Sequence, residues 1–156
     1  MNNEEQFKKY INLFLMAIVS FISMFILMYM MVDSYANVYI NLNQFYMAGI
    51  MTMPMVIIEL FLMRSMYANK KINALIAVWS LALFIIFIVF LRKQTAIDDK
   101  EFLKSMIPHH AAAILMCKES HIQDPEIQEL CKNIGRTQQA EIDFMRAKLE
   151  AYGGVS

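Results

Sequence analysis

The sequence predicts an all-α protein in which three transmembrane helices precede an antiparallel helical hairpin outside the membrane. Hydrophobic residues make up 58% of the 156 residues and the mean hydropathy is +0.42, more than an ordinary soluble domain shows. Three runs with few or no charges are each long enough, as helices, to cross about 30 Å of hydrocarbon. They cover about residues 10–32, 45–64 and 72–92, so we expect a membrane domain over residues 1–93 and a hairpin domain over residues 94–156.

The first apolar run has two interpretations. Lys8 and Lys9 precede it, and Ser34-Tyr35-Ala36 is similar to a signal-peptidase site that would make Asn37 the first residue. The apolar stretch is, however, about twice as long as that of a signal peptide. We therefore expect an uncleaved membrane anchor.

The basic residues predict the orientation in the membrane. The loop of residues 33–44 has no lysine or arginine, whereas Lys8 and Lys9 precede the first run and Arg64, Lys70 and Lys71 lie between the second and third. By the positive-inside rule the N-terminus is cytoplasmic, and three spans then place the hairpin on the periplasmic or extracellular face of the cytoplasmic (inner) membrane. Arg92 and Lys93 favour the opposite orientation. The net charge is zero and the hairpin is acidic, which gives no indication of nucleic-acid binding.

The hairpin is predicted to contain helices over about residues 98–122 and 125–151. Asp98 or Asp99 can cap the first helix, and Asp124-Pro125 supplies an N-cap and a first-turn proline for the second. Pro108 and Gly135 are candidate bends. The predicted inner faces consist of Phe102, Met106, His109, Ala113, Met116 and Ser120 on the first helix, and Ile127, Leu130, Cys131, Ile134, Gln138, Glu141, Met145 and Leu149 on the second.

Polar and sulfur-bearing groups are predicted to meet where the two helices face each other. If the chain turns back at about residue 124, residues whose numbers sum to about 247 or 248 lie at the same height. An unpaired polar group buried there would cost about 1–3 kcal/mol. A bound metal ion would satisfy such groups. The predicted pairs are Phe102 with Met145, Met106 with Glu141, His110 with Gln138, Ala113 with Ile134, and Cys117 with Cys131.

The types of donor favour a soft monovalent ion. Histidine, methionine and cysteine suit Cu(I) and also Ag(I), whereas calcium and magnesium need several oxygen ligands. The sequence contains neither the Glu-x-x-His pairs of di-iron bundles nor the His-Glu-x-x-His motif of zinc proteases. We therefore expect metal binding for sequestration, delivery or tolerance, without catalysis.

The segment Met106-Ile107-Pro108-His109-His110 resembles the motif of the family called domain of unknown function 305. That family is ferritin-like and some of its members bind copper. Phe45-Tyr46-Met47-Ala48 and Asn69-Lys70-Lys71 are similar to a membrane-anchored branch of it. The resemblance also includes Asp99-x-x-Phe102, Ala113, Asp124-Pro125, Gln138-x-x-Glu141-Ile142 and Met145.

The resemblance implies roles for particular residues. Met106, His109, His110 and Met145 would be metal ligands, with Met116 next, and Gln138 and Glu141 would orient the histidines. Copper-binding members often have two hairpins where this chain has one. We therefore expect the chain, anchored in the lipid bilayer, to form a homodimer or higher homo-oligomer whose hairpins complete a four-helix bundle outside the membrane, with other copper-handling proteins as candidate partners.

Three further hairpin residues have open interpretations. His121 lies near a helix end, where it either interacts with terminal carbonyl groups or binds metal. Cys117 and Cys131 do not belong to the family motif. They form a disulfide in an oxidising compartment, remain inert thiols, or bind metal, and their predicted equal height favours the disulfide.

Methionine is unusually frequent in the membrane domain. Packing is the favoured role for these side chains, and thioether binding of Cu(I) is the alternative. Glu59, the one acid well inside a predicted span, is either functional or paired with Arg64. Pro54 and Gly49 predict a kinked second span. The methionines form two stripes, Met24, Met28 and Met31 in the first span and Met47, Met51 and Met55 in the second.

Two other functions are compatible with the sequence. The hairpin could be a structural module for oligomerisation or partner docking, in which the histidines only complete its core. A redox enzyme that uses the bound metal is the less favoured alternative. Loss of Cu(I) binding on replacing Met106, His109 and His110 would separate metal binding from a purely structural role.

Overall fold

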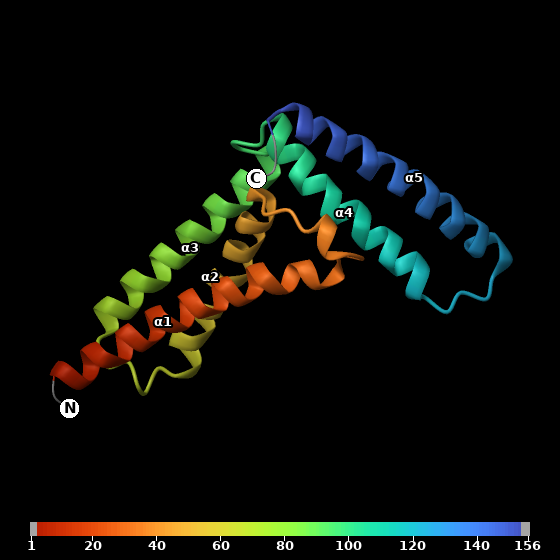
Figure 1. The fold of residues 1–156 in the computed structure, drawn as a ribbon. Coiled ribbons are helices and arrows are strands. Elements are labelled where there is room, and N and C mark those ends of the chain that lie inside the picture. The colour runs from red at the N-terminus through yellow and green to blue at the C-terminus, as the bar shows by residue number, and fades with distance from the viewer. Residues whose placement is uncertain (1–2, 154–156) are drawn as a thin grey trace. The chain divides into compact units, whose positions relative to one another are not determined.

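The computed structural model describes residues 3–153, and within that range the chain forms helices joined by turns and loops, with no strand, which confirms the predicted all-α class. Two short 3₁₀ helices, η1 and η2, lie between the first two α-helices (Figure 1). The elements are α1 (Asn3–Leu27), η1 (Met28–Met31), η2 (Tyr35–Asn37), α2 (Leu42–Leu62), α3 (Lys70–Lys93), α4 (Asp99–Glu119) and α5 (Pro125–Ala151).

The chain divides into two compact units. The membrane unit comprises Met1–Leu27 and Asn43–Thr95, and the hairpin unit comprises Met28–Leu42 and Ala96–Ser156. The loop between the first two spans, which the sequence-based division placed in the membrane domain, thus packs with the hairpin. Residues 1–2 and 154–156, at the outer limits of the two predicted domains, lie outside the described residues.

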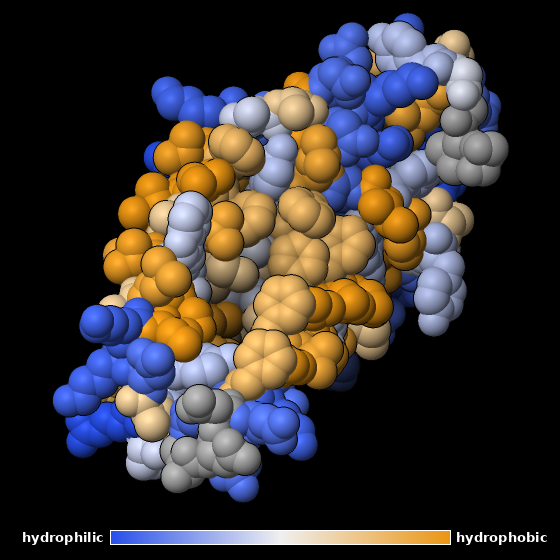
Figure 2. Space-filling view, turned by 90° about the vertical axis from the view of Figure 1, so that its left-hand side faces the viewer, coloured by the Kyte–Doolittle hydropathy of each residue, from blue (hydrophilic) through white to orange (hydrophobic). Residues whose placement is uncertain are grey.

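Three helical segments of the described chain are long and apolar enough to cross a membrane. They are Glu4–Met31, Leu42–Leu62 and Lys70–Lys93, close to the three predicted spans. Their side chains are mostly exposed in the isolated chain, as expected for helices whose apolar surface faces lipid. Figure 2 shows apolar residues as a broad orange surface in the middle of the view.

Helix α2 is the best buried of the three apolar helices. Ala48 and Thr52 are fully buried, and the Thr52 hydroxyl donates to the Ala48 carbonyl at 2.8 Å. A Cβ atom built on Gly49 would lie 2.5 Å from the Phe87 ring, so the absence of a side chain permits the close approach of α2 and α3. The helix continues through Pro54, which cannot donate a backbone hydrogen bond.

The hairpin helices begin at the predicted caps. The Asp98 carboxylate accepts from the backbone N–H of Glu101, and the Asp124 carboxylate accepts from those of Glu126 and Ile127, with Pro125 in the first turn. Figure 1 shows α4 and α5 running antiparallel, side by side. Their shared core contains Leu103, Ile107, Ala111, Ile142, Met145 and Leu149.

The predicted inner face of α4 is wrong by about one position. Phe102 and Met116 are about half exposed and His109 is exposed, whereas Ile107 and His110 are buried. Two rows of apolar residues run along α4 about 100° apart, and periodicity does not choose between them. The row with the aliphatic side chains is the one that packs.

The predicted pairing across the hairpin is confirmed for the two cysteines and differs for His110. Cys117 lies opposite Cys131, as expected, with 5.1 Å between their Cα atoms. His110 contacts Glu141 rather than Gln138, about one turn further along α5. Both side chains are long enough to lean along the helix axis, so matching heights do not determine which of them meet. On α5, Met145 and Leu149 are buried as predicted, but Ile142 replaces Glu141 in the core.

The segment 28–42 covers part of the hairpin core. Val32 and Tyr39 pack against the buried cluster. Arg146 of α5 donates to the Ala36 carbonyl and to the Asn37 side-chain oxygen, both at 2.7 Å. This anchoring arginine was not anticipated from the sequence. Its position between Ile142 and Leu149, beside the apolar stripe of α5, is the only pattern that could have pointed to it.

Candidate functional site

His110 lies at the contact between α4 and α5, where both of its ring nitrogens meet acceptors. Nδ1 lies 2.9 Å from the Met106 carbonyl oxygen, one turn earlier on α4. Nε2 lies 2.7 Å from a carboxylate oxygen of Glu141 on α5. The carbonyl can only accept, so Nδ1 carries a proton and the ring is held in one orientation. His110 is therefore a bonded link between the two helices.

His109 has the opposite environment. Its side chain is exposed, and it has no hydrogen-bond partner among residues 3–153. The two histidine rings lie 6.0 Å apart between centroids, at 64° to each other. Adjacent residues on a helix point in directions about 100° apart, which explains why one ring is buried and the other open.

The four predicted ligands other than His110 lie on two faces of the hairpin. His109 and Met116 lie on the exposed side of α4, and Met145 is buried in the hairpin core. Met106 is half-buried and packs against the same core, one turn before His109. The structure therefore brings Met106 into the neighbourhood of both faces, while Met116 and Met145 belong to different faces of the hairpin.

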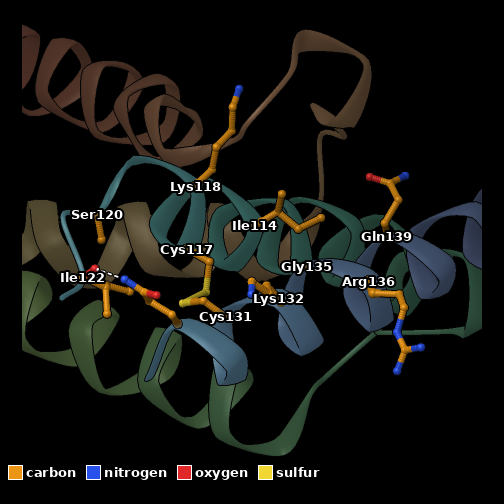
Figure 3. A pocket seen from close by; sticks show the side chains of 11 residues that line it. Ile114, Cys117, Lys118, Ser120, Ile122, Cys131, Lys132, Gly135, Arg136 and Gln139 are labelled. Atoms are coloured by element: carbon orange, nitrogen blue, oxygen red, sulfur yellow. Dashed lines mark hydrogen bonds between the residues drawn. A yellow bond between two sulfur atoms is a disulfide. The ribbon is translucent and has the colours of Figure 1, made fainter. Parts of the chain in front are cut away.

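The two cysteines form a disulfide that joins the end of α4 to the beginning of α5. It forms part of the wall of a pocket of about 620 Å³ at this end of the hairpin, together with Ile114, Gly135 and Arg136 (Figure 3). In this state neither sulfur is a thiolate, so neither is a ligand of the kind that Cu(I) prefers. His121 is exposed, and its Nδ1 lies 3.4 Å from the Glu119 carbonyl oxygen.

The hairpin donors are mainly methionine and histidine. Within residues 3–153, no group of three or more His, Cys, Asp or Glu side chains is arranged to hold a metal ion. A metal site on the hairpin would accordingly depend on methionine thioethers, on a second chain, or on both. Thioether and imidazole ligands together select soft ions.

The methionine stripe predicted in the first span is interrupted, whereas the one predicted in the second span lies within α2. Helix α1 ends at Leu27, so Met28 and Met31 lie in η1 and belong to a different unit from Met24. Met47 and Met51 are exposed on α2, and Met55 is partly buried. These positions fit contact with lipid and with neighbouring helices.

Glu59 lies in the last turn of α2 rather than deep within a span. Its carboxylate accepts from the Tyr67 hydroxyl at 3.5 Å, and no ion pair with Arg64 forms within the described chain. Burial first, and the nearby Glu59 carboxylate second, raise the pKa of Tyr67. The phenol thus stays protonated and serves as the donor.

Comparison with known proteins identifies the family. Residues 62–154 match the family described as "Domain of unknown function (DUF305)", a range that includes α3 and the whole hairpin. The chain is 34% identical over 139 residues to "Uncharacterized protein L153" of Acanthamoeba polyphaga mimivirus. The aligned region covers 87% of this chain and 90% of that relative. No solved structure matches. A match over more than half of the chain and a relative that spans most of it agree: the protein belongs to the DUF305 family.

Proposed function

We propose that this protein is a membrane-anchored binder of Cu(I), and equally of Ag(I), which it holds for sequestration or delivery without catalysis. The observation that carries the proposal is the environment of His109. An exposed imidazole without a hydrogen-bond partner in the described chain lies one turn from the Met106 thioether, on the face of α4 that also carries Met116. Exchangeable soft donors of this kind suit a metal that must be released again.

One chain supplies only part of such a site. His109 and Met116 are seven positions apart, which corresponds to about 10 Å along a helix. Met106 and His109 can reach a common ion, but Met116 is remote from it. We propose that a second copy docks on the exposed face of α4 and contributes the remaining thioether or imidazole groups.

His110 and Glu141 have a positioning role in this proposal. Their contact fixes α4 against α5, and the bond from His110 to the Met106 carbonyl holds the backbone at the first ligand position. His110 binds metal only if Glu141 moves away from Nε2. The primary ligands are therefore Met106 and His109.

The arrangement of the chain supports a hairpin on one defined side of the membrane. The segment 28–42 follows α1 and packs with the hairpin that follows α3. Both must lie on the same side, as they do when three helices cross the bilayer. Lys8, Lys9, Arg64, Lys70 and Lys71 would then lie on the other side, and we propose that this side is the cytoplasm. A disulfide in the hairpin fits an oxidising outer compartment.

Competition titration with a chromogenic Cu(I) chelator tests the proposal on the full-length protein in detergent, without oxygen and with ascorbate, which keeps the copper as Cu(I) and leaves the Cys117–Cys131 disulfide intact. We expect the M106L/H109A variant to lose at least tenfold in affinity, because a site with few ligands depends on each of them (about 1.4 kcal/mol per tenfold change). The matched control is H121A, which removes the exposed histidine at the end of α4 and should bind as the unmodified protein does. Equal affinity of all three proteins would contradict the proposal.

A docking module without metal is the second candidate. Large apolar side chains are exposed along the hairpin, among them Phe102, Leu130 and Phe144, and such a surface fits a protein partner. If light scattering shows that oligomers persist in F102S, and no Cu(I) binding is detected, both proposals are contradicted. Oligomers lost in F102S without any metal binding would favour docking alone.

A further inference from the structure

A second pocket lies in the membrane unit, at the end that carries the basic residues. It has a volume of about 660 Å³ and lies between the first turns of α1 and the beginning of α3. Gln6, Lys70 and Lys71 line it with polar groups, and Phe7 and Ile72 line it with apolar groups. No acidic side chain belongs to its wall.

Hydrogen bonds give this pocket a fixed wall. The Gln6 side-chain oxygen accepts from the backbone N–H of Ala68 at 3.2 Å. The Tyr10 hydroxyl donates to the Asn73 side-chain oxygen at 2.7 Å, and the Asn73 amide in turn donates to the Tyr67 carbonyl at 2.9 Å. The loop before α3 is thereby tied to α1 through backbone and side-chain groups.

The charges around the pocket favour the binding of an anion. Lys70 and Lys71 occupy the first turn of α3, where the helix macrodipole is positive and acids are normally favoured, yet this turn contains no acid. Two cations beside a positive helix end, with no acid in the pocket wall, are relieved by a negatively charged oxygen.

The surroundings of the pocket are those of a membrane surface. Phe7 is 66% exposed and Ile72 is 39% exposed, so apolar side chains flank the lysines. In Figure 2 polar residues gather at the lower end of the apolar surface, the end at which the first turns of α1 lie in Figure 1. A ligand that fits combines an anionic head with an apolar body.

We propose that this pocket binds the headgroup phosphate of an anionic phospholipid. Lys70 and Lys71 hold the phosphate oxygens, and Phe7 and Ile72 lie against the upper part of the acyl chains. The site would anchor the basic ends of α1 and α3 to one leaflet, independently of any metal bound by the hairpin.

Native mass spectrometry of the full-length protein tests the proposal after reconstitution into mixed phosphatidylcholine and phosphatidylglycerol bilayers. We expect retained phosphatidylglycerol on the unmodified protein and about a tenfold loss in K70Q/K71Q, because each lysine near an anionic headgroup contributes substantially to binding. The matched control is K8Q/K9Q, which removes the same charge from the same end of the membrane unit but not from the pocket wall. It should change retention by less than about twofold.

Three results would overturn the proposal. Equal loss in both double variants would mean attraction by overall charge, and unchanged retention in K70Q/K71Q would mean that the lysines do not hold the lipid. Displacement of the lipid by excess inorganic phosphate would indicate a site for free phosphate. Circular dichroism checks folding, and K70R/K71R, which keeps both charges, should retain the lipid if K70Q/K71Q proves unstable.

Discussion

At the residue scale, the adjacent histidines have different chemistry because the helix turns them in different directions. His110 has both ring nitrogens occupied, while His109 is open. The sequence identified the pair and the likeness to a known family, but it could not assign one ring to the interior. That assignment depends on which row of α4 meets α5, which is a property of tertiary packing.

We expect replacement of His110 to affect stability and replacement of His109 to affect metal binding. H110A should lower the free energy of unfolding by about 1–2 kcal/mol, because a link between the helices is lost while half-exposed Glu141 regains water. Thermal unfolding followed by circular dichroism measures this change. H109A is the control and should stay within about 0.5 kcal/mol of the unmodified protein. Equal destabilisation by both substitutions would contradict the structural assignment.

At the scale of the elements, local patterns were predictable and contacts were not. Long apolar runs predicted the spans, and Asp98 and Asp124-Pro125 predicted where α4 and α5 begin, because capping depends on a few neighbouring residues. The buried face of α4 depends on a segment more than sixty positions earlier in the chain, since Tyr39 packs on the cluster that contains Leu103. A single sequence does not reveal that contact.

Helix approach in the membrane unit depends on the glycine in α2. G49A should lower the thermal stability of the detergent-solubilised protein, by about 1–3 kcal/mol, because the added methyl group overlaps the Phe87 ring. G135A is the matched control: a Cβ there meets nothing within 4 Å, so alanine should stabilise α5 by about 0.5–1 kcal/mol. A neutral G49A would show that α2 and α3 can separate without cost.

At the scale of the whole molecule, the pairing of the first loop with the hairpin limits the possible membrane arrangements. Both segments belong to one compact unit, so the number of crossings between them must be even. Helices α2 and α3 are long and apolar enough to supply these two crossings. The positive-inside rule then decides between the two orientations that remain.

Labelling with a membrane-impermeant maleimide tests the orientation in intact cells. The native cysteines are joined in the hairpin, so an introduced thiol reports its own location. Gln123→Cys, at the turn between α4 and α5, should react from outside, and Ser65→Cys, between α2 and α3, should react only after permeabilisation. The reverse pattern would place the hairpin in the cytoplasm.

The hydrogen bonds from Arg146 to Ala36 and Asn37 join the first loop of the chain to its last helix, so they form late in synthesis. The loop is synthesised before α2, α3 and the hairpin, so the Ala36 carbonyl and the Asn37 side-chain oxygen gain Arg146 as a donor only after α5 is made, whereas the Asn37 amide already donates to Asp33 within the loop. Contact with Arg146 therefore indicates that the chain has been synthesised through α5. A chain interrupted after α3 would lack this contact, which distinguishes an unfinished protein from a finished one.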